Sequence, residues 1–239
     1  MLPENKKQIG LVGKVILVAA GKGGVGKSTV SCLLAKQLQA KGHKVGILDA
    51  DIYGPSIPTI LNIEDSHPKT ENGLFIPVEA DGISVMSIGF LIKKESALVW
   101  RGPMLSKALN QLLFSTNWGE LDYLIVDMPP GTGDVHISII QRCKIYGAII
   151  VSTPDKVAII DVERAIDLYN KMLVPVIGVV ENMSYVESDG KKIMLFGDSG
   201  VDSMADKFKL NILAKLPLVP ALASNAELYN SKELQIKFE

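Results

Sequence analysis

Apolar residues in this chain gather in short runs that alternate with stretches of helical periodicity. The runs contain few polar positions and end at turn-forming residues, which is typical of strands buried on both faces of a parallel sheet. Between them, apolar residues recur at spacings of three and four, which predicts amphipathic helices. Strands are expected at 14–20, 44–49, 83–87, 123–127, 148–153, 176–182 and 211–216, and helices at 27–41, 104–115, 135–143, 157–173, 201–209 and 221–228. This alternation predicts an α/β fold with a mostly parallel central sheet and helices on both faces.

The length and composition fit one large domain. A chain of 239 residues that is 47% hydrophobic can still be built around one core, and no repeat or low-complexity tract divides it, so residues 1–239 are interpreted as a single domain. The segment 64–81 is polar and rich in turn formers, which indicates an excursion over the surface. The segment 1–14 lacks the apolar core of a signal peptide, and no apolar run reaches the roughly 18 residues of a membrane span.

A glycine-rich loop follows the first predicted strand and leads into the first predicted helix. It reads Gly21-Lys22-Gly23-Gly24-Val25-Gly26-Lys27-Ser28-Thr29 and satisfies the pattern G-x-x-x-x-G-K-[ST]. The glycines let phosphate oxygens approach the backbone, whose N–H groups at a helix N-terminus favour an anion. In this motif the lysine, Lys27, contacts the outer phosphates and the hydroxyl of Ser28 is a ligand of Mg²⁺. The second lysine, Lys22, is not required by such a loop, so its charge is free to act elsewhere, a subunit boundary included.

Two acidic residues, Asp49 and Asp51, follow the second predicted strand. Open α/β sheets bind their ligands at the carboxyl ends of the strands. Because residues two apart in an extended chain face the same side, both carboxylates are expected to face the phosphates. Asp49 would act on magnesium, directly or through water, and Asp51 on an attacking water molecule. A solvated acidic turn is the alternative interpretation of the pair.

Asp127 ends another apolar run, 123–127. An aspartate at the end of a buried strand beside a phosphate loop is typical of a magnesium site, with direct or water-mediated contact. The loop after it combines prolines, which add stiffness, with glycines, which add freedom. Such a mixture suits a segment that adopts two defined positions, as a sensor of the γ-phosphate must. The predicted switch residues are Pro130, Gly131, Gly133 and Asp134.

With these motifs in order, the chain resembles the Mrp/ApbC iron–sulfur cluster carrier ATPases of the MinD/ParA superfamily, whose phosphate loop carries the same additional lysine. The segments that carry the resemblance are 49–56 (DADIYGPS), 100–104 (WRGPM), 122–134 (DYLIVDMPPGTGD), 151–154 (VSTP) and 181–184 (ENMS). Together with the glycine-rich loop they extend from about residue 10 to 220. The resemblance implies a three-layer P-loop NTPase fold and Mg²⁺-dependent ATP hydrolysis in the assembly of iron–sulfur clusters or their transfer to client proteins. It also implies a homodimer that is clamped together by ATP.

The resemblance further implies individual roles. Lys22 would contact the nucleotide phosphate bound in the partner subunit, and Lys22, Lys27 and Asp51 would form the catalytic set, with Asp51 orienting the attacking water. Asn182 would hydrogen-bond the adenine, since an amide can pair with both a ring nitrogen and the exocyclic amine. A buried asparagine that caps the next turn is the alternative for Asn182. The segment 53–58 would be the first nucleotide-sensing switch.

The sequence departs from the family at the cluster site. Relatives that carry clusters have a C-x-x-C motif shortly after the ENMS segment, through which each subunit supplies two thiolates. Here residues 185–192 read YVESDGKK and contain no cysteine. Cys32 is expected to be a small buried residue. Cys143, between Arg142 and Lys144, is expected to be exposed with a lowered pKa, but one thiol does not replace a pair. The iron–sulfur cluster that the family implies is therefore in doubt. Because the resemblance begins at about residue 10, the short N-terminal accessory domain of some relatives is not expected within these 239 residues.

Charge and cysteine content limit the classes of partner and the cellular compartment that are expected. Lys and Arg number 25 and Asp and Glu number 26, so there is no basic surplus to attract nucleic acid or an anionic membrane, and neither is expected as a partner. Two distant cysteines without a disulfide framework indicate the reducing cytoplasm. The three histidines, His43, His67 and His136, are not expected to be metal ligands or catalytic groups.

Two other functions remain open. One is a regulatory or scaffold ATPase that has lost cluster binding together with the cysteine pair. The other is a MinD/ParA-like positioning ATPase, which would need a basic amphipathic C-terminal helix. The segment 221–239 balances Lys232 and Lys237 with Glu227, Glu233 and Glu239, which is a poor match for anionic lipid.

Overall fold

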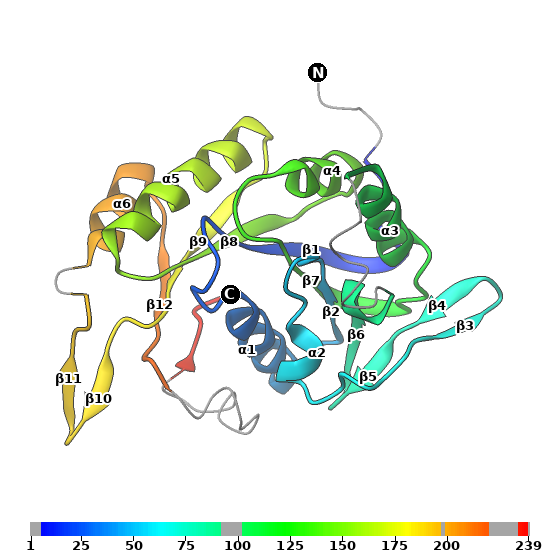
Figure 1. The fold of residues 1–239 in the computed structure, drawn as a ribbon, viewed down its shortest axis with the longest axis horizontal. Helices are drawn as coiled ribbons and strands as arrows, with labels where there is room; N and C mark the ends of the chain where they lie inside the picture. Colours follow the sequence, from blue (N-terminus) through cyan, green and yellow to red (C-terminus); the bar gives the residue numbers. More distant parts are fainter. Residues whose placement is uncertain (1–5, 92–101, 197–198, 220–233, 239) are drawn as a thin grey trace.

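The chain forms an eight-stranded sheet, mostly parallel, with helices on both faces (Figure 1). We describe residues 6–91, 102–196, 199–219 and 234–238 of a computed structural model. The strand order is β12-β9-β8-β1-β7-β2-β6-β5, and every neighbouring pair is parallel except β5 and β6. The fold class expected from the sequence is confirmed.

The order and direction of the strands determine at which edge of the sheet their carboxyl ends lie. The strands of the sheet are β1 (Leu11–Ala20), β2 (Val45–Asp49), β5 (Val78–Ala80), β6 (Ile83–Ser87), β7 (Glu120–Asp127), β8 (Gly147–Ser152), β9 (Val176–Glu181) and β12 (Ile212–Lys215). The helices are α1 (Lys27–Ala40), α2 (Ile57–Ile60), α3 (Gly102–Phe114), α4 (Asp134–Arg142), α5 (Lys156–Lys171) and α6 (Gly200–Phe208), with a 3-10 turn, η1 (Ile88–Phe90). Parallel strands bring their carboxyl ends to one edge of the sheet, so the loops after β1, β2, β7 and β9 open at the same edge.

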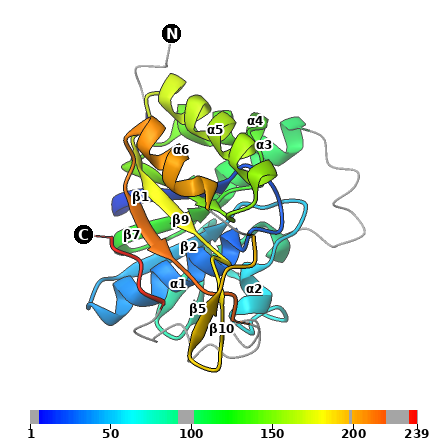
Figure 2. The same cartoon turned by 90° about the vertical axis from the view of Figure 1, so that its left-hand side faces the viewer.

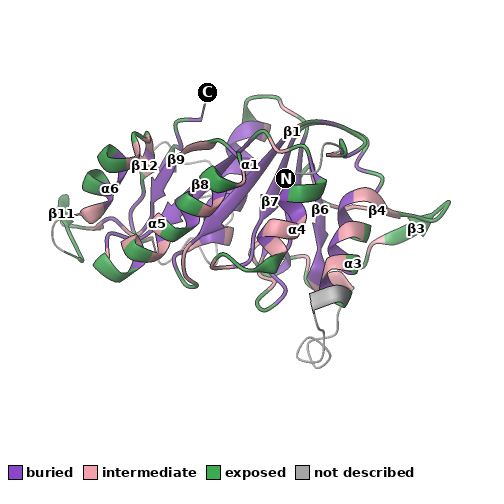
Figure 3. Cartoon of the chain, turned by 90° about the horizontal axis from the view of Figure 1, so that it is seen from above, coloured by how far each residue is buried: buried purple, intermediate pink, exposed green. Residues whose placement is uncertain are grey.

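Two apolar cores lie on opposite faces of the sheet. One core packs α3, α4, α5 and α6 against it, and the other packs α1, α2 and the C-terminal segment that contains Leu234, Ile236 and Phe238 (Figure 2). β2 and β8 are buried throughout, and β1 and β7 are buried except near their N-terminal ends (Figure 3), which is why these strands read as continuous apolar runs in the sequence. In the described residues no helix is both long enough and apolar enough to cross a membrane.

The polar segment 64–81 contains short strands that the sequence pattern does not predict. β3 (Lys69–Glu71) and β4 (Leu74–Ile76) form an exposed hairpin, and β5 joins the edge of the main sheet antiparallel to β6. A second small hairpin, β10 (Val186–Ser188) with β11 (Lys191–Ile193), follows β9. The predicted helix 221–228 and residues 100–101 of the WRGPM motif lie outside the described residues.

Candidate functional site: a phosphate-binding loop faced by acidic strand ends

The loop between β1 and α1 is shaped to hold an anion. Gly24 and Gly26 both adopt φ of +80°, a left-handed conformation that glycine adopts without strain. Gly26 caps α1, so the N–H groups of the first helical turn have no partner within the helix and face the loop that precedes it. The loop opens on a cavity of about 390 Å³ lined by Lys22, Gly23, Gly24, Gly26, Lys27, Ser28, Thr29, Asp51, Gly54, Ser56, Ile60 and Pro130. Amide donors at a helix N-terminus together with a lysine form a donor set that suits phosphate.

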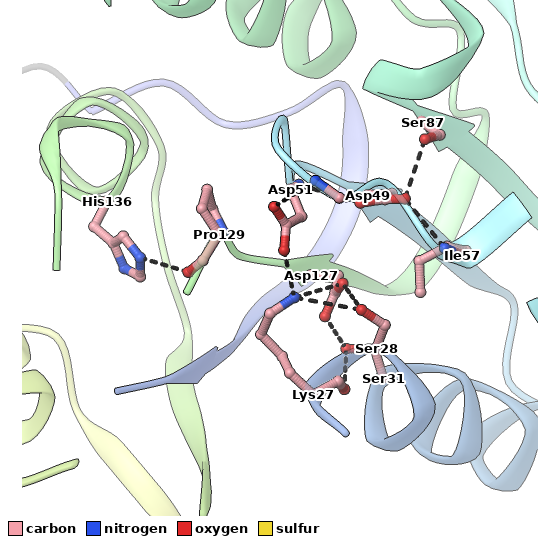
Figure 4. Close-up of polar contacts among 11 residues, drawn as sticks. Lys27, Ser28, Ser31, Asp49, Asp51, Ile57, Ser87, Asp127, Pro129 and His136 are labelled. Carbon is pink, nitrogen blue, oxygen red and sulfur yellow. Dashed lines mark hydrogen bonds and ion pairs between the residues drawn. The ribbon is translucent and has the colours of Figure 1, made fainter. Parts of the chain in front are cut away.

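Lys27 is the centre of a buried charge cluster (Figure 4). Its ammonium Nζ lies 2.7 Å from Asp127 Oδ2 and 3.6 Å from Asp51 Oδ2. Ser28 Oγ donates to the same Asp127 oxygen at 2.6 Å. One lysine, one hydroxyl and two carboxylates therefore meet beneath the cavity. The hydroxyl and carboxylate oxygens in this set are of the kind that Mg²⁺ prefers.

Asp127 is fixed by its strand and by its hydrogen bonds. In β7 it pairs in register with Val18 of β1 and Asp49 of β2, which places it directly beside the phosphate loop. Its side chain is fully buried, and Ser31 Oγ donates to Oδ1 at 2.7 Å. A buried carboxylate is stabilised only when donors surround it, and here an ammonium and two hydroxyls do so.

Asp49 does not face the cavity in the way that the alternation rule predicts. Its Oδ2 accepts from Ser87 Oγ at 3.1 Å and from the N–H of Ile57 at 3.2 Å, and its Oδ1 accepts from the N–H of Asp51 at 3.1 Å. The donors that hold the Asp49 carboxylate come from β6 and from the start of α2, which the alternation within one strand does not anticipate. Burial, and then the neighbouring Asp127 carboxylate, raise the pKa of Asp49. Among the described residues, the hydrogen bonds of Asp49 therefore connect the segment after β2 to β6.

Asp51 lies on the wall of the cavity, opposite Lys27. Its Oδ1 accepts from the N–H of Gly54 at 3.3 Å. Burial raises the pKa of Asp51, and the Lys27 ammonium opposes that rise. The chain then continues through exposed Tyr53, 76% accessible, into the short helix α2, so the predicted switch 53–58 is partly helical.

Lys22 forms an ion pair within its own chain. Its Nζ lies 2.5 Å from Oδ2 of Asp155, whose carboxylate also caps the N-terminus of α5 by accepting from the N–H groups of Val157 and Ala158. The hydrogen bond from Lys22 holds the pKa of Asp155 below its ordinary value. Beside it, a Cβ on Gly21 would collide with the backbone of Asp161, so this glycine allows α5 to approach the loop.

Asn182 lies against the phosphate loop at the end of β9. Its side chain is buried, and Nδ2 donates to the carbonyl of Val25 at 2.9 Å. A Cβ on Gly26 would collide with this same amide nitrogen. The structure therefore brings Asn182 to the loop, as it does Lys22, Lys27, Ser28, Asp51 and Asp127.

The predicted switch leads from β7 into α4 at the same edge of the sheet. Pro130 lines the cavity, and Gly131, with φ of +84°, donates from its N–H to the carbonyl of Ala20 at 2.9 Å. Gly133 caps α4, which begins with the exposed Asp134. In the first turn of α4, His136 is fully buried and hydrogen-bonds back to Pro129. No spacing motif marks this histidine, and the sequence predicts no metal-binding or catalytic role for it.

Both cysteines are buried free thiols, which corrects the expectation for Cys143. Lys7 pairs with Cys143 in an isolated parallel bridge, so the N-terminal segment covers a thiol that its charged neighbours suggested was exposed. Burial raises the pKa of Cys143 to about 12 and that of Cys32 well above its ordinary value. In the described part of the chain no three His, Cys, Asp or Glu side chains form a group that could hold a metal ion.

Comparisons with known proteins agree with this geometry. Residues 11–236 match the ParA family model, described as the NUBPL iron-transfer P-loop NTPase. Proteins called iron–sulfur cluster carrier protein from Rickettsia conorii and Haemophilus influenzae are 52% and 48% identical over 89% and 90% of this chain. The chain spans 63% and 59% of the length of those relatives.

Solved structures show the same fold. A nucleotide-binding protein from Archaeoglobus fulgidus in complex with ADP superposes with a TM-score of 0.82 at 37% identity, covering 95% of this chain and 92% of that one. The septum site-determining protein MinD from Pyrococcus horikoshii gives 0.68 at 19% identity, covering 93% and 90%. The second likeness concerns the fold alone, but the family model covers nearly the whole chain. The chain belongs to the ParA/NUBPL family of P-loop NTPases.

Proposed function

We propose that this protein binds and hydrolyses ATP with Mg²⁺ and acts, as the Mrp/ApbC-type carriers do, in iron–sulfur cluster assembly or transfer to client proteins. The observation that carries the nucleotide part is the meeting of Lys27, Ser28, Asp51 and Asp127 beneath the glycine loop. The family match and the names of the relatives support the iron–sulfur part. We also propose that residues 1–239 form a single domain.

The residues of the loop explain how such a site would work. Backbone N–H groups from Gly23 to Ser28 bind the phosphates, and Lys27 exchanges its contact with Asp127 for one with phosphate oxygen. Ser28 and Asp127 would hold Mg²⁺, and Asp49, which pairs with Asp127 in the neighbouring strand, would act on the ion through water. The ion would neutralise charge on the phosphates when bound. Asp51 orients the attacking water from the facing wall. Phosphoryl transfer depends on positioning and charge neutralisation, and these residues supply both.

Two further roles belong to the same proposal. Lys22 leaves Asp155 and contacts phosphate in the partner subunit of an ATP-dependent homodimer, while Asn182 contacts the adenine. The segment from Pro130 to Asp134 reports the γ-phosphate. The cytoplasm is the proposed location, since both thiols are free.

Hydrolysis is tested by Lys27→Ala and Asp51→Ala, with Lys207→Ala and Asp202→Ala on the exposed surface of α6 as matched controls. Released phosphate is measured with and without Mg²⁺. We expect turnover in the wild type and in both controls, and at least about a hundredfold loss in the two site variants. Undiminished turnover in either site variant would contradict its assigned role.

A second candidate function, a scaffold ATPase that carries no cluster of its own, is favoured by the cysteines. The sequence contains only Cys32 and Cys143, and burial raises the pKa of both, whereas cluster ligation uses thiolates. Anaerobic incubation with iron and sulfide separates the candidates. A stable chromophore that is lost in Cys143→Ser would support a cluster on this chain, and no uptake would support the scaffold, with cluster ligands supplied by a client.

A further inference from the structure

His136 is a buried polar residue that joins three parts of the molecule. It lies in the first turn of α4, and its ring is inaccessible to solvent. Its Nε2 is 2.9 Å from the carbonyl oxygen of Pro129, and its Nδ1 is 2.9 Å from the hydroxyl of Tyr169 in α5. A buried imidazole with both nitrogens paired is fixed in position, because any rotation would leave polar atoms unsatisfied.

The partners determine the direction of these hydrogen bonds. A carbonyl oxygen can only accept, so Nε2 carries the proton and donates to Pro129. A neutral imidazole then has an acceptor at Nδ1, and the Tyr169 hydroxyl donates to it. Burial lowers the pKa of His136 to about 4 and raises that of Tyr169, so near neutral pH the ring is uncharged and the hydroxyl keeps its proton.

The Pro129 carbonyl marks the point at which the predicted switch begins. Upstream, Met128 is tied to β1 by a hydrogen bond from its N–H to the carbonyl of Val18 at 3.0 Å. Downstream, Thr132, Gly133 and Asp134 are exposed. Tyr169, at the other end of the chain of hydrogen bonds, is buried in the core on α5, the helix whose N-terminus holds Lys22 through Asp155.

We propose that His136 is a positioning residue that fixes the Pro129 carbonyl to α5, so that the switch 130–134 turns about a fixed point. The consequence for catalysis rests on the proposed ATP hydrolysis. With the hinge held, contact with the γ-phosphate rotates only the exposed residues. Without it, the segment samples many positions, and turnover falls while nucleotide binding by the glycine loop is retained.

Side-chain replacements that keep one nitrogen at a time test this arrangement. His136→Gln retains an amide donor near the position of Nε2, and His136→Asn retains a polar group near Nδ1 only. Tyr169→Phe removes the second hydrogen bond without changing the ring. Ile139→Val, a buried apolar change on the same helix, is the matched control for loss of packing.

Two measurements on the wild type and the variants, without nucleotide, test the contact itself. Long-range ¹H–¹⁵N correlation spectra should show the neutral Nε2–H form at pH 7, and Tyr169→Phe should keep this form because the Pro129 carbonyl still accepts from Nε2. Hydrogen exchange at Gly131 should be faster in His136→Asn than in His136→Gln or Ile139→Val. A charged or Nδ1–H ring in the wild type, or equal exchange in all variants, would overturn the proposal whether or not ATP is hydrolysed.

Kinetics tests the consequence. We expect His136→Asn to lower kcat about tenfold, the effect of depriving a buried carbonyl of its donor, with the Kd for ATP within about twofold. His136→Gln should recover most of that loss. Equal kcat in His136→Asn and Ile139→Val would overturn the link to catalysis, whereas a wild type that binds ATP without hydrolysing it would instead refute the proposed function.

Discussion

Acid should destabilise the wild-type protein more steeply than His136→Gln. Burial lowers the pKa of His136 from its ordinary value of 6.5 to about 4. Between these values the unfolded chain binds a proton that the folded chain does not bind, so stability falls as the pH falls. Integrating this difference for a single group gives a loss of about 2 kcal/mol between pH 7 and pH 5. His136→Gln has no group that titrates at this position and should not show this component.

The comparison with the variant is necessary because other groups titrate as well. The raised pKa of Asp49 acts in the opposite direction, since its folded form holds a proton that the unfolded form releases as the pH rises. Urea unfolding is measured for both proteins at pH 7, 6 and 5. The difference between their free energies of unfolding removes the contributions of groups that both proteins contain. The stability of the wild type relative to His136→Gln should fall by about 2 kcal/mol over that range. A constant difference would refute a buried neutral ring at His136.

Three further predictions follow from the site. Gly26→Ala should lower the free energy of unfolding by more than the backbone strain of about 1–2 kcal/mol, because its Cβ also meets Asn182. Gly24→Ala, at the same φ of +80° with no protein atom within 4 Å of its Cβ, should cost only that strain in urea unfolding. Equal losses of stability in the two variants would argue against the packing of Asn182 on the loop. Neither Cys32 nor Cys143 should react with Ellman's reagent until guanidinium unfolds the protein, and prompt reaction of the native protein would show an accessible thiol. Ser31→Ala should lower the free energy of unfolding by about 1–3 kcal/mol, since it removes a donor to the buried Asp127; a change below about 0.5 kcal/mol would mean that another group replaces the hydroxyl.

The buried strands and the order of the motifs could be predicted from the sequence, because each is marked by residues that follow one another in the chain. The strand 83–87 has the predicted bounds, and the glycine loop, the two acidic strand ends and Asn182 all meet at one edge of the sheet. The rule that strand carboxyl ends share an edge is enough to bring them together. β3 is polar and exposed and β4 is only three residues long, so neither carries a comparable pattern, and the sequence predicts only an excursion over the surface there.

What the sequence could not provide depends on contacts between distant segments. Cys143 is covered by a bridge to Lys7, and His136 finds its partner Tyr169 on another helix. Neither pairing can be recognised from residue spacing or composition. The alternation of an extended chain predicts that Asp49 faces the phosphates, but its carboxylate accepts from Ser87 and from the N–H of Ile57, and these partners lie on other elements.

The glycine loop is the proposed site for Mg-ATP, and every role assigned above depends on it. Isothermal titration of the full chain with ATP and Mg²⁺ tests this most directly, with Lys207→Ala as the control for Lys27→Ala. We expect uptake of ATP by the wild type and the control, dependence on Mg²⁺, and loss of that uptake in a folded Lys27→Ala protein. Absence of binding in the wild type, or equal affinity in Lys27→Ala, would contradict it.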